Sequence, residues 1–160
     1  MMVALRRSRA WAAATLAAAG LAAAPAHAVL GGNVSTIAGD GVRLNATRHQ
    51  VAPLSAQVGS HLITLADGSS IREYTNAGGI VFAVAWSTRF KPDLTALLGQ
   101  HAVAYAAAAS EVMKAPGIRR QVELRQGDLV VQSAGRLNAF IGKAWLRSLV
   151  PEGVDVDALR

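Results

Sequence analysis

The stretch Ile80-Val81-Phe82-Ala83-Val84-Ala85-Trp86 decides the fold of this chain. Its side chains are apolar at both alternating sets of positions, whereas a strand with one solvated face would carry polar residues at every second position. Such a run is typical of a strand that is buried on both faces. We therefore expect it in the middle of a sheet, with other parts of the chain covering each side.

The residues before this strand predict a β-hairpin. Residues 60–65 and 70–75 are rich in strand-forming side chains, and Asp67-Gly68 between them is a dipeptide that favours the positive φ angles of a tight turn. Residues 76–79, Asn-Ala-Gly-Gly, supply a second turn that leads into the central strand. We therefore expect three consecutive antiparallel strands over residues 60–86.

The residues after the central strand predict a helix that covers one face of the sheet. Pro92 and Asp93 suit a first helical turn, because a proline there loses no hydrogen bond and a carboxylate faces the positive end of the helix dipole. Residues of one helix face then recur at spacings of three and four: Leu94, Leu97, Leu98, His101, Tyr105, Ala108, Ala109 and Val112. Gly99 costs about 1 kcal/mol relative to alanine, so the segment is either one helix or two shorter ones.

The last part of the chain predicts further strands. Residues 118–125 alternate apolar and polar side chains, and a turn at residues 126–128 leads into the apolar run 129–133. Residues 136–149 fit both a helix and a third antiparallel strand, and we favour the strand because the Ala134-Gly135 link is short and Gly142 weakens a helix. The expected fold class is α+β, with an antiparallel sheet of five or six strands and one principal helix packed across it.

The first 28 residues predict a secretory signal peptide. Arg6, Arg7 and Arg9 precede an apolar run over residues 10–24, and Pro25 is followed by Ala26 and Ala28 around one histidine. The alternative, a transmembrane anchor, is less favoured because the run of 15 residues is shorter than the roughly 20 needed to span a bilayer. We expect cleavage between Ala28 and Val29 by the general secretion route, since the neighbours of Arg6-Arg7 do not support a twin-arginine signal.

Residues 29–57 lie between the signal peptide and the expected domain. They are rich in small and polar side chains, and several glycines together with Pro53 prevent any sustained period. We interpret them as an irregular N-terminal leader, extended or partly helical, that lies on the domain. The single α+β domain is then expected over residues 58–160.

The charge and the cysteine count limit the function classes. The chain has a net charge of +6, but the signal peptide holds three of the 16 basic residues and no acidic one, so residues 29–160 carry 13 basic and 10 acidic side chains, a net of +3. Arg119, Arg120, Arg125, Lys143 and Arg147 form at most a small basic strip, and we expect no nucleic-acid binding. The absence of cysteine from the sequence excludes a lipoprotein anchor and disulfide support.

No motif for catalysis, a cofactor or a metal is found in the sequence. His49, His61 and His101 follow no metal-ligand spacing, and neither a G-x-S-x-G elbow nor a phosphate-binding glycine loop occurs. Arg72, Tyr74 and Trp86 are the candidate interaction patch, because aromatic and charged side chains on strands are typical of recognition surfaces. Alternation places Arg72 and Tyr74 on one side of their strand and Glu73 on the other. The alternative is that Arg72 or Glu73 forms an ion pair within the sheet while Tyr74 and Trp86 pack in the core.

Residues 66–99 carry a pattern that resembles a known family. Gly68, Arg72-Glu73-Tyr74, the segment Gly79 to Trp86, and Pro92-Asp93-Leu94 with Leu97-Leu98-Gly99 are similar to the recurring motifs of a proteobacterial family of exported proteins whose function is unknown. Val29-Leu30-Gly31-Gly32 is similar to the start of that family after cleavage, and residues 134–154 resemble its closing segment. Residues 87–91 form a longer linker than the family usually has. The resemblance implies export in a Gram-negative bacterium and brings no reaction, cofactor or catalytic residue.

These observations favour a non-enzymatic binding or interaction module of the periplasm or cell envelope, without a membrane anchor after cleavage. The expected partner is another protein or an envelope component. The alternative is an enzyme, or an inhibitor of one, whose site is assembled only in the fold. His61 or His101 in an open cleft, within hydrogen-bonding distance of a serine or aspartate, would favour that alternative.

Overall fold

A computed structural model of the chain describes residues 30–114 and 121–160. The expected signal peptide, residues 1–28, and its cleavage site at Ala28 and Val29 lie outside the described residues. Residues 118–120 of the last expected hairpin do so as well.

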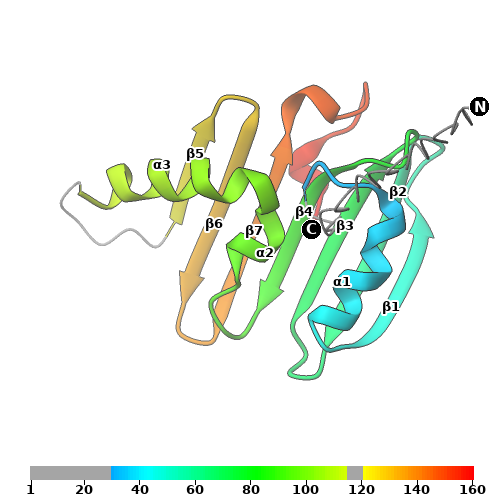
Figure 1. Cartoon of the computed structure of the whole chain (residues 1–160), viewed down its shortest axis with the longest axis horizontal. Helices are drawn as coiled ribbons and strands as arrows, with labels where there is room; N and C mark the ends of the chain where they lie inside the picture. The colour runs from blue at the N-terminus through cyan, green and yellow to red at the C-terminus, as the bar shows by residue number, and fades with distance from the viewer. Residues whose placement is uncertain (1–29, 115–120) are drawn as a thin grey trace, which may run out of the picture.

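The described residues form an α+β fold around one antiparallel sheet (Figure 1). Within residues 30–114 and 121–160 the sheet has seven strands in the order β1-β2-β3-β4-β7-β6-β5. They are β1 (Ala46–Pro53), β2 (Val58–Leu65), β3 (Ser70–Asn76), β4 (Val81–Thr88), β5 (Gln121–Gln126), β6 (Leu129–Arg136) and β7 (Ala139–Leu146). The fold class is confirmed. The predicted number of five or six strands is wrong, because β1 was not expected.

Strand β4 is the fourth of the seven strands, and the prediction that it is buried on both faces is confirmed. Residues 81–86 are each at most 5% exposed. Val81, Val84 and Trp86 belong to the core under the helices, whereas Phe82, Ala83 and Ala85 belong to a second core on the opposite face. The irregular register between β3 and β4 near Thr75 explains why Phe82 and Ala83 share one face.

The helices lie on one face of the sheet, which we call the helix face (Figure 1). They are α1 (Ile37–Arg43), α2 (Leu94–Leu98) and α3 (Ala102–Lys114). The carboxylate of Asp93 caps α2 by accepting hydrogen bonds from the N–H groups of Thr95 and Ala96 at 2.9 and 3.2 Å. Gly99 has a φ of +51° and separates α2 from α3 through a 3₁₀ turn, so the segment consists of two helices. The prediction of one principal helix is therefore too simple, although α3 is the longest.

The N-terminal leader has more regular structure than its sequence indicates. It contains a 3₁₀ turn (Val34–Thr36), helix α1 and the edge strand β1. Leu30 and Ile37 are each 1% exposed and lie in the core under the helices. The leader is therefore part of the domain, because these apolar side chains stabilise local structure that its glycines disfavour.

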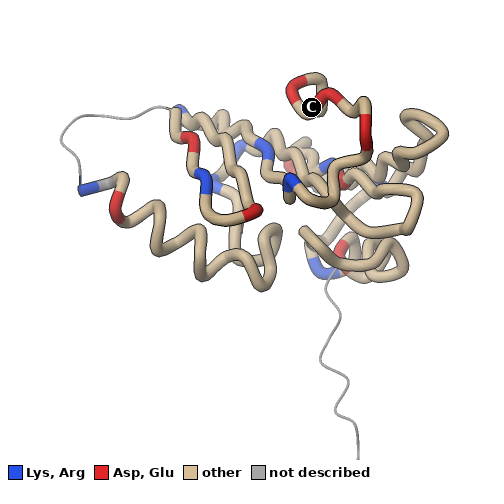
Figure 2. The backbone as a smooth tube through the Cα atoms, turned by 90° about the horizontal axis from the view of Figure 1, so that it is seen from above, with Lys and Arg blue, Asp and Glu red and all other residues tan. Residues whose placement is uncertain are grey.

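Residues 154–160, which we call the tail segment, lie on the opposite face of the sheet (Figure 2). We call this opposite face the open face, because the helices do not cover it. The segment contains a 3₁₀ turn (Val156–Ala158), and Leu159 is 5% exposed in the second core. Strand β7 (Ala139–Leu146) confirms the strand predicted within residues 136–149.

Candidate functional site

The open face is organised in rows of side chains that run across the strands. One row is set by direct pairing: Leu62 opposite Arg72, Arg72 opposite Ala85, Ala85 opposite Lys143, and Lys143 opposite Gln132. A neighbouring row contains Ser70, Ser87, Ile141, Ala134 and Gln121. A third row on the other side contains Tyr74, Ala83, Trp145 and Val130, and it is covered by the apolar part of the tail segment.

The first two rows enclose a pocket with a volume of about 570 Å³, which we call the sheet pocket. Side chains of these rows line it, and Asp157, Leu159 and Arg160 of the tail segment form one of its walls. The volume falls within the range of about 300–1,000 Å³ that is usual for small-molecule sites. The open face thus offers a concave site, whereas the helix face is filled by packed side chains.

Small side chains produce this hollow. Strand β4 presents Ala85 and Ser87 to the open face, between the longer Arg72 and Lys143 of the adjacent strands. On the helix face the size pattern is reversed, because Trp86 lies opposite Gly142 of β7. A Cβ atom built on Gly142 would lie 2.4 Å from Cζ2 of Trp86, so the indole ring occupies the space that a side chain would need.

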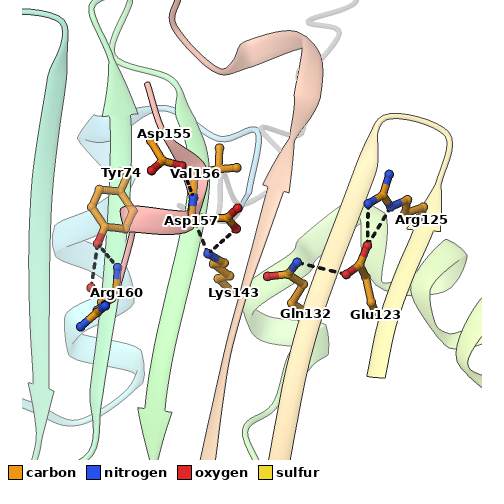
Figure 3. Close-up of polar contacts among 9 residues, drawn as sticks. All are labelled: Tyr74, Glu123, Arg125, Gln132, Lys143, Asp155, Val156, Asp157 and Arg160. Carbon is orange, nitrogen blue, oxygen red and sulfur yellow. Dashed lines mark hydrogen bonds and ion pairs between the residues drawn. The ribbon is translucent and has the colours of Figure 1, made fainter. Parts of the chain in front are cut away.

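Two cations of the pocket flank Ala85 on neighbouring strands. Lys143 donates to the carbonyl oxygen of Val156 at 2.8 Å and to the carboxylate of Asp157 at 3.3 Å (Figure 3). Its charge is therefore partly compensated by the tail segment. Arg72 is half-buried, and its Nε atom is buried without a hydrogen-bond partner among the described residues. Since a buried donor without a partner costs free energy, Arg72 would gain from an added acceptor.

The tail segment is held in place by Tyr74. The Tyr74 hydroxyl donates to the backbone oxygen of Arg160 at 2.7 Å and accepts from its N–H at 3.0 Å (Figure 3). Leu159 packs in the second core beside these hydrogen bonds. Strand β3 therefore fixes the wall of the pocket through Tyr74 while it supplies Arg72 to the pocket itself.

Strands β5 and β6 carry a separate polar cluster at the edge of the sheet. The carboxylate of Glu123 accepts from Nε of Arg125 at 2.8 Å and from Nε2 of Gln132 at 3.1 Å (Figure 3). These hydrogen bonds, led by the one from Arg125, lower the pKa of Glu123. Glu123 does not line the sheet pocket, and its strand β5 lies four positions from β3 in the sheet, so it does not compensate the charge of Arg72.

The helix face holds the most perturbed acid of the described chain. Glu73 is 2% exposed, and burial raises its pKa to about 8, with a further increase from Asp40 and an opposing effect of Arg43. His61 lies directly opposite it on β2, and burial together with His49 lowers the pKa of His61. The rings of His49 and His61 stack with centroids 5.7 Å apart. This buried acid–histidine cluster is separated from the sheet pocket by the sheet itself.

The structure does not bring the predicted patch of Arg72, Tyr74 and Trp86 together on one surface. Tyr74 and Trp86 are 2% and 4% exposed and lie in different cores, Tyr74 on the open face and Trp86 on the helix face. Arg72 lines the pocket from the open face, Trp86 contributes to the lining although it is 4% exposed, and Tyr74 does not line the pocket. The patch as a three-residue surface is wrong, because neighbouring strands in register place Trp86 opposite Ile71 rather than opposite Arg72. The predicted split of Arg72 and Tyr74 from Glu73 is confirmed.

Sequence reasoning missed the residues that build the rest of the pocket, namely Ala85, Ser87, Gln132, Ile141 and Lys143. Their contribution depends on the order of the strands, since β4 pairs with β7 and not with β5, which follows it along the chain. The signal that was available is the succession of small residues at alternate positions of the central strand, Ala83, Ala85 and Ser87.

The histidines do not form the arrangement expected of a hydrolytic site. His61 is 7% exposed, and Nδ1 of His61 and Nε2 of His101 are buried without hydrogen-bond partners among residues 30–114 and 121–160. In the same part of the chain no group of three or more His, Asp or Glu residues could hold a metal ion. No helix of the described residues is long and apolar enough to cross a membrane.

These features define a class of α+β protein in which one antiparallel sheet carries helices on one face and a pocket on the other. The chain belongs to the family described as "Protein of unknown function (DUF2844)", which matches residues 26–159. The match covers the leader as well as the strands, in agreement with the single domain of the structure. No curated protein and no solved structure matches the chain.

Proposed function

We propose that this chain is an exported, non-enzymatic binding protein of the periplasm or cell envelope of a Gram-negative bacterium, and that its binding site is the sheet pocket. The observation that carries the proposal is the pocket of about 570 Å³ on the open face, bounded on one side by the tail segment. A concave site with apolar walls and a few polar groups is typical of ligand binding.

The placement of the titratable groups supports binding rather than catalysis. The acid and the histidine with shifted pKa values, Glu73 and His61, lie on the helix face and are nearly inaccessible. The pocket is lined instead by arginine, lysine, glutamine and serine side chains, which recognise a ligand by hydrogen bonds. An enzyme or an enzyme inhibitor is the alternative, and it would use this same pocket.

Export is supported by the sequence of residues 1–28 and by the family resemblance given above. Expression of the full chain in a Gram-negative host tests it directly. We expect the protein in the periplasmic fraction, with an intact mass that begins at Val29. A full-length mass in the cytoplasm or the membrane would overturn the proposed export.

A thermal-shift screen of a metabolite library tests the pocket. We expect compounds that raise the melting temperature of the mature protein, and we expect this effect to disappear in Ala85→Leu, because the longer side chain extends into the hollow. The matched control is Ala38→Leu, the same substitution at an exposed position of α1 on the other face. Stabilisation that is the same in all three proteins, or compounds that are chemically turned over, would contradict a binding function of the pocket.

A further inference from the structure

The charge of the sheet pocket is unbalanced. Among the side chains that line it are three bases, Arg72, Lys143 and Arg160, and one acid, Asp157. Asp157 is an ion-pair partner of Lys143, at 3.3 Å, so it does not compensate Arg72. Among the described residues, Arg72 has neither an ion pair nor a hydrogen bond to another side chain, and its Nε atom is buried without a partner.

The position of Arg72 suits recognition of an anionic group. Arg72 and Lys143 lie two strands apart with Ala85 directly between them, which corresponds to about 10 Å between their backbones. Alanine leaves this interval unoccupied above the sheet. A guanidinium group offers several N–H donors in one plane, and carboxylates and phosphates accept them in pairs.

Apolar side chains form part of the remaining walls, beside polar ones such as Ser87 and Gln132. Leu62 flanks Arg72 on one side, and Leu159 closes the pocket at the tail segment. Ile141 also lines the pocket and is 56% exposed, which is high for a large aliphatic side chain that faces a concavity. Contact with an apolar part of a ligand would remove this surface from water, which favours binding.

We infer that the sheet pocket binds a small organic anion, with its carboxylate or phosphate on Arg72 and its apolar part against Leu62, Ile141 and Leu159. This inference rests on the proposed binding function and adds the chemical class of the ligand. A macromolecular anion fits less well, because Asp157, Leu159 and Arg160 of the tail segment form one wall of the pocket.

Two fluorescent probes with the same aromatic skeleton test the inference. 1-Anilinonaphthalene-8-sulfonate carries an anionic group, and N-phenyl-1-naphthylamine is neutral. We expect the anionic probe to bind the mature protein about tenfold more tightly or better, as is usual for a charge-assisted contact. Arg72→Gln should remove this preference and leave the affinity for the neutral probe unchanged, while Arg72→Lys retains part of it. The matched control is Arg136→Gln, an exposed arginine of β6 that does not line the pocket.

Displacement of the anionic probe identifies the head group. Decanoate and decyl phosphate should displace it and decanol should not, and the tighter of the two anions shows whether the site prefers carboxylate or phosphate. Equal displacement by decanol, or an unchanged affinity of Arg72→Gln for the anionic probe, would overturn the inference while the binding function stands. If Ala85→Leu does not abolish the binding of either probe, or if neither probe binds the wild-type protein, both the inference and the proposed function fail.

Discussion

The hydroxyl group of Tyr74 is hydrogen-bonded to both backbone polar groups of Arg160, 86 residues further along the chain. It donates to the backbone oxygen at 2.7 Å and accepts from the N–H at 3.0 Å. This pair joins the strand that supplies Arg72 to the segment that forms a wall of the pocket. The shape of the pocket therefore depends on a residue that is not part of its lining.

Replacement of Tyr74 by phenylalanine should loosen the tail segment. The ring remains in the core, but both hydrogen bonds to Arg160 are lost, at a cost of about 1–3 kcal/mol in the free energy of unfolding. Hydrogen exchange followed by mass spectrometry should show faster exchange in residues 154–160 and unchanged exchange in β4. Tyr105→Phe removes a hydroxyl on α3, on the other face, and serves as the control. Equal protection of the tail segment in both variants would show that Leu159 alone holds it.

The contact between Trp86 and Gly142 should make residue 142 intolerant of any side chain. A Cβ atom there would lie 2.4 Å from Trp86 and 2.5 Å from the backbone oxygen of Gln132. We expect Gly142→Ala to lower the free energy of unfolding by about 1–3 kcal/mol, because backbone and ring must both move. Gly39→Ala is the matched control, since a Cβ atom at that exposed helical position meets nothing within 4 Å, and it should be neutral or stabilising by up to about 1 kcal/mol. Denaturant unfolding measures both, and a neutral Gly142→Ala would show that Trp86 is free to move.

The central elements of the fold could be predicted because their patterns are local. The apolar run of β4 and the Asp67-Gly68 turn between β2 and β3 can each be recognised from consecutive residues, and Gly68 indeed has a φ of +81°. The break at Gly99 is of the same kind. In each case the residue type and its immediate neighbours determine the backbone.

The leader could not be predicted in this way. Helix α1 contains Gly39 and Gly41, which disfavour a helix, and β1 is exposed at seven of its eight positions, so it shows no alternation. Helix α1 is held by the burial of Ile37 and strand β1 by its pairing with β2, and both are tertiary effects. The pocket was missed for a related reason, since Arg72 and Lys143 are brought to either side of Ala85 by the pairing of β4 with β7.

The buried side chains of the leader should be essential for the stability of the whole domain. Ile37 is 1% exposed, and its replacement by alanine leaves a cavity that costs about 2–5 kcal/mol. Val42 lies on the same helix but is 79% exposed, so Val42→Ala should change the free energy of unfolding by less than about 0.5 kcal/mol. Thermal unfolding followed by circular dichroism distinguishes the two variants. If they unfolded alike, the leader would be an accessory that the sheet does not need.

Burial of Glu73 should make the protein less stable at alkaline pH. The pKa of Glu73 is raised from 4.5 to about 8. The other titratable groups of this region are Asp40 and Arg43 of α1, His61 of β2, and His49 of β1, which stacks on His61. Since the folded state holds a proton that the unfolded state has released, its stabilising effect is complete below pH 4.5 and is lost as the pH rises to about 8.

The window from about pH 6.5 to 8 contains most of this effect. The pKa of His61 is lowered from 6.5, so His61 adds an opposing slope that is largest near that value and disappears toward pH 8, where His61 is neutral in both states. We expect the free energy of unfolding to fall in this window by about 1 kcal/mol for each pH unit, and this fall to vanish in Glu73→Gln, which keeps the shape of the side chain without its titration. Glu111→Gln, at an exposed position of α3, should retain the wild-type slope. A wild-type stability that is constant or rises between pH 6.5 and 8 would show that Glu73 is already ionised in the folded protein.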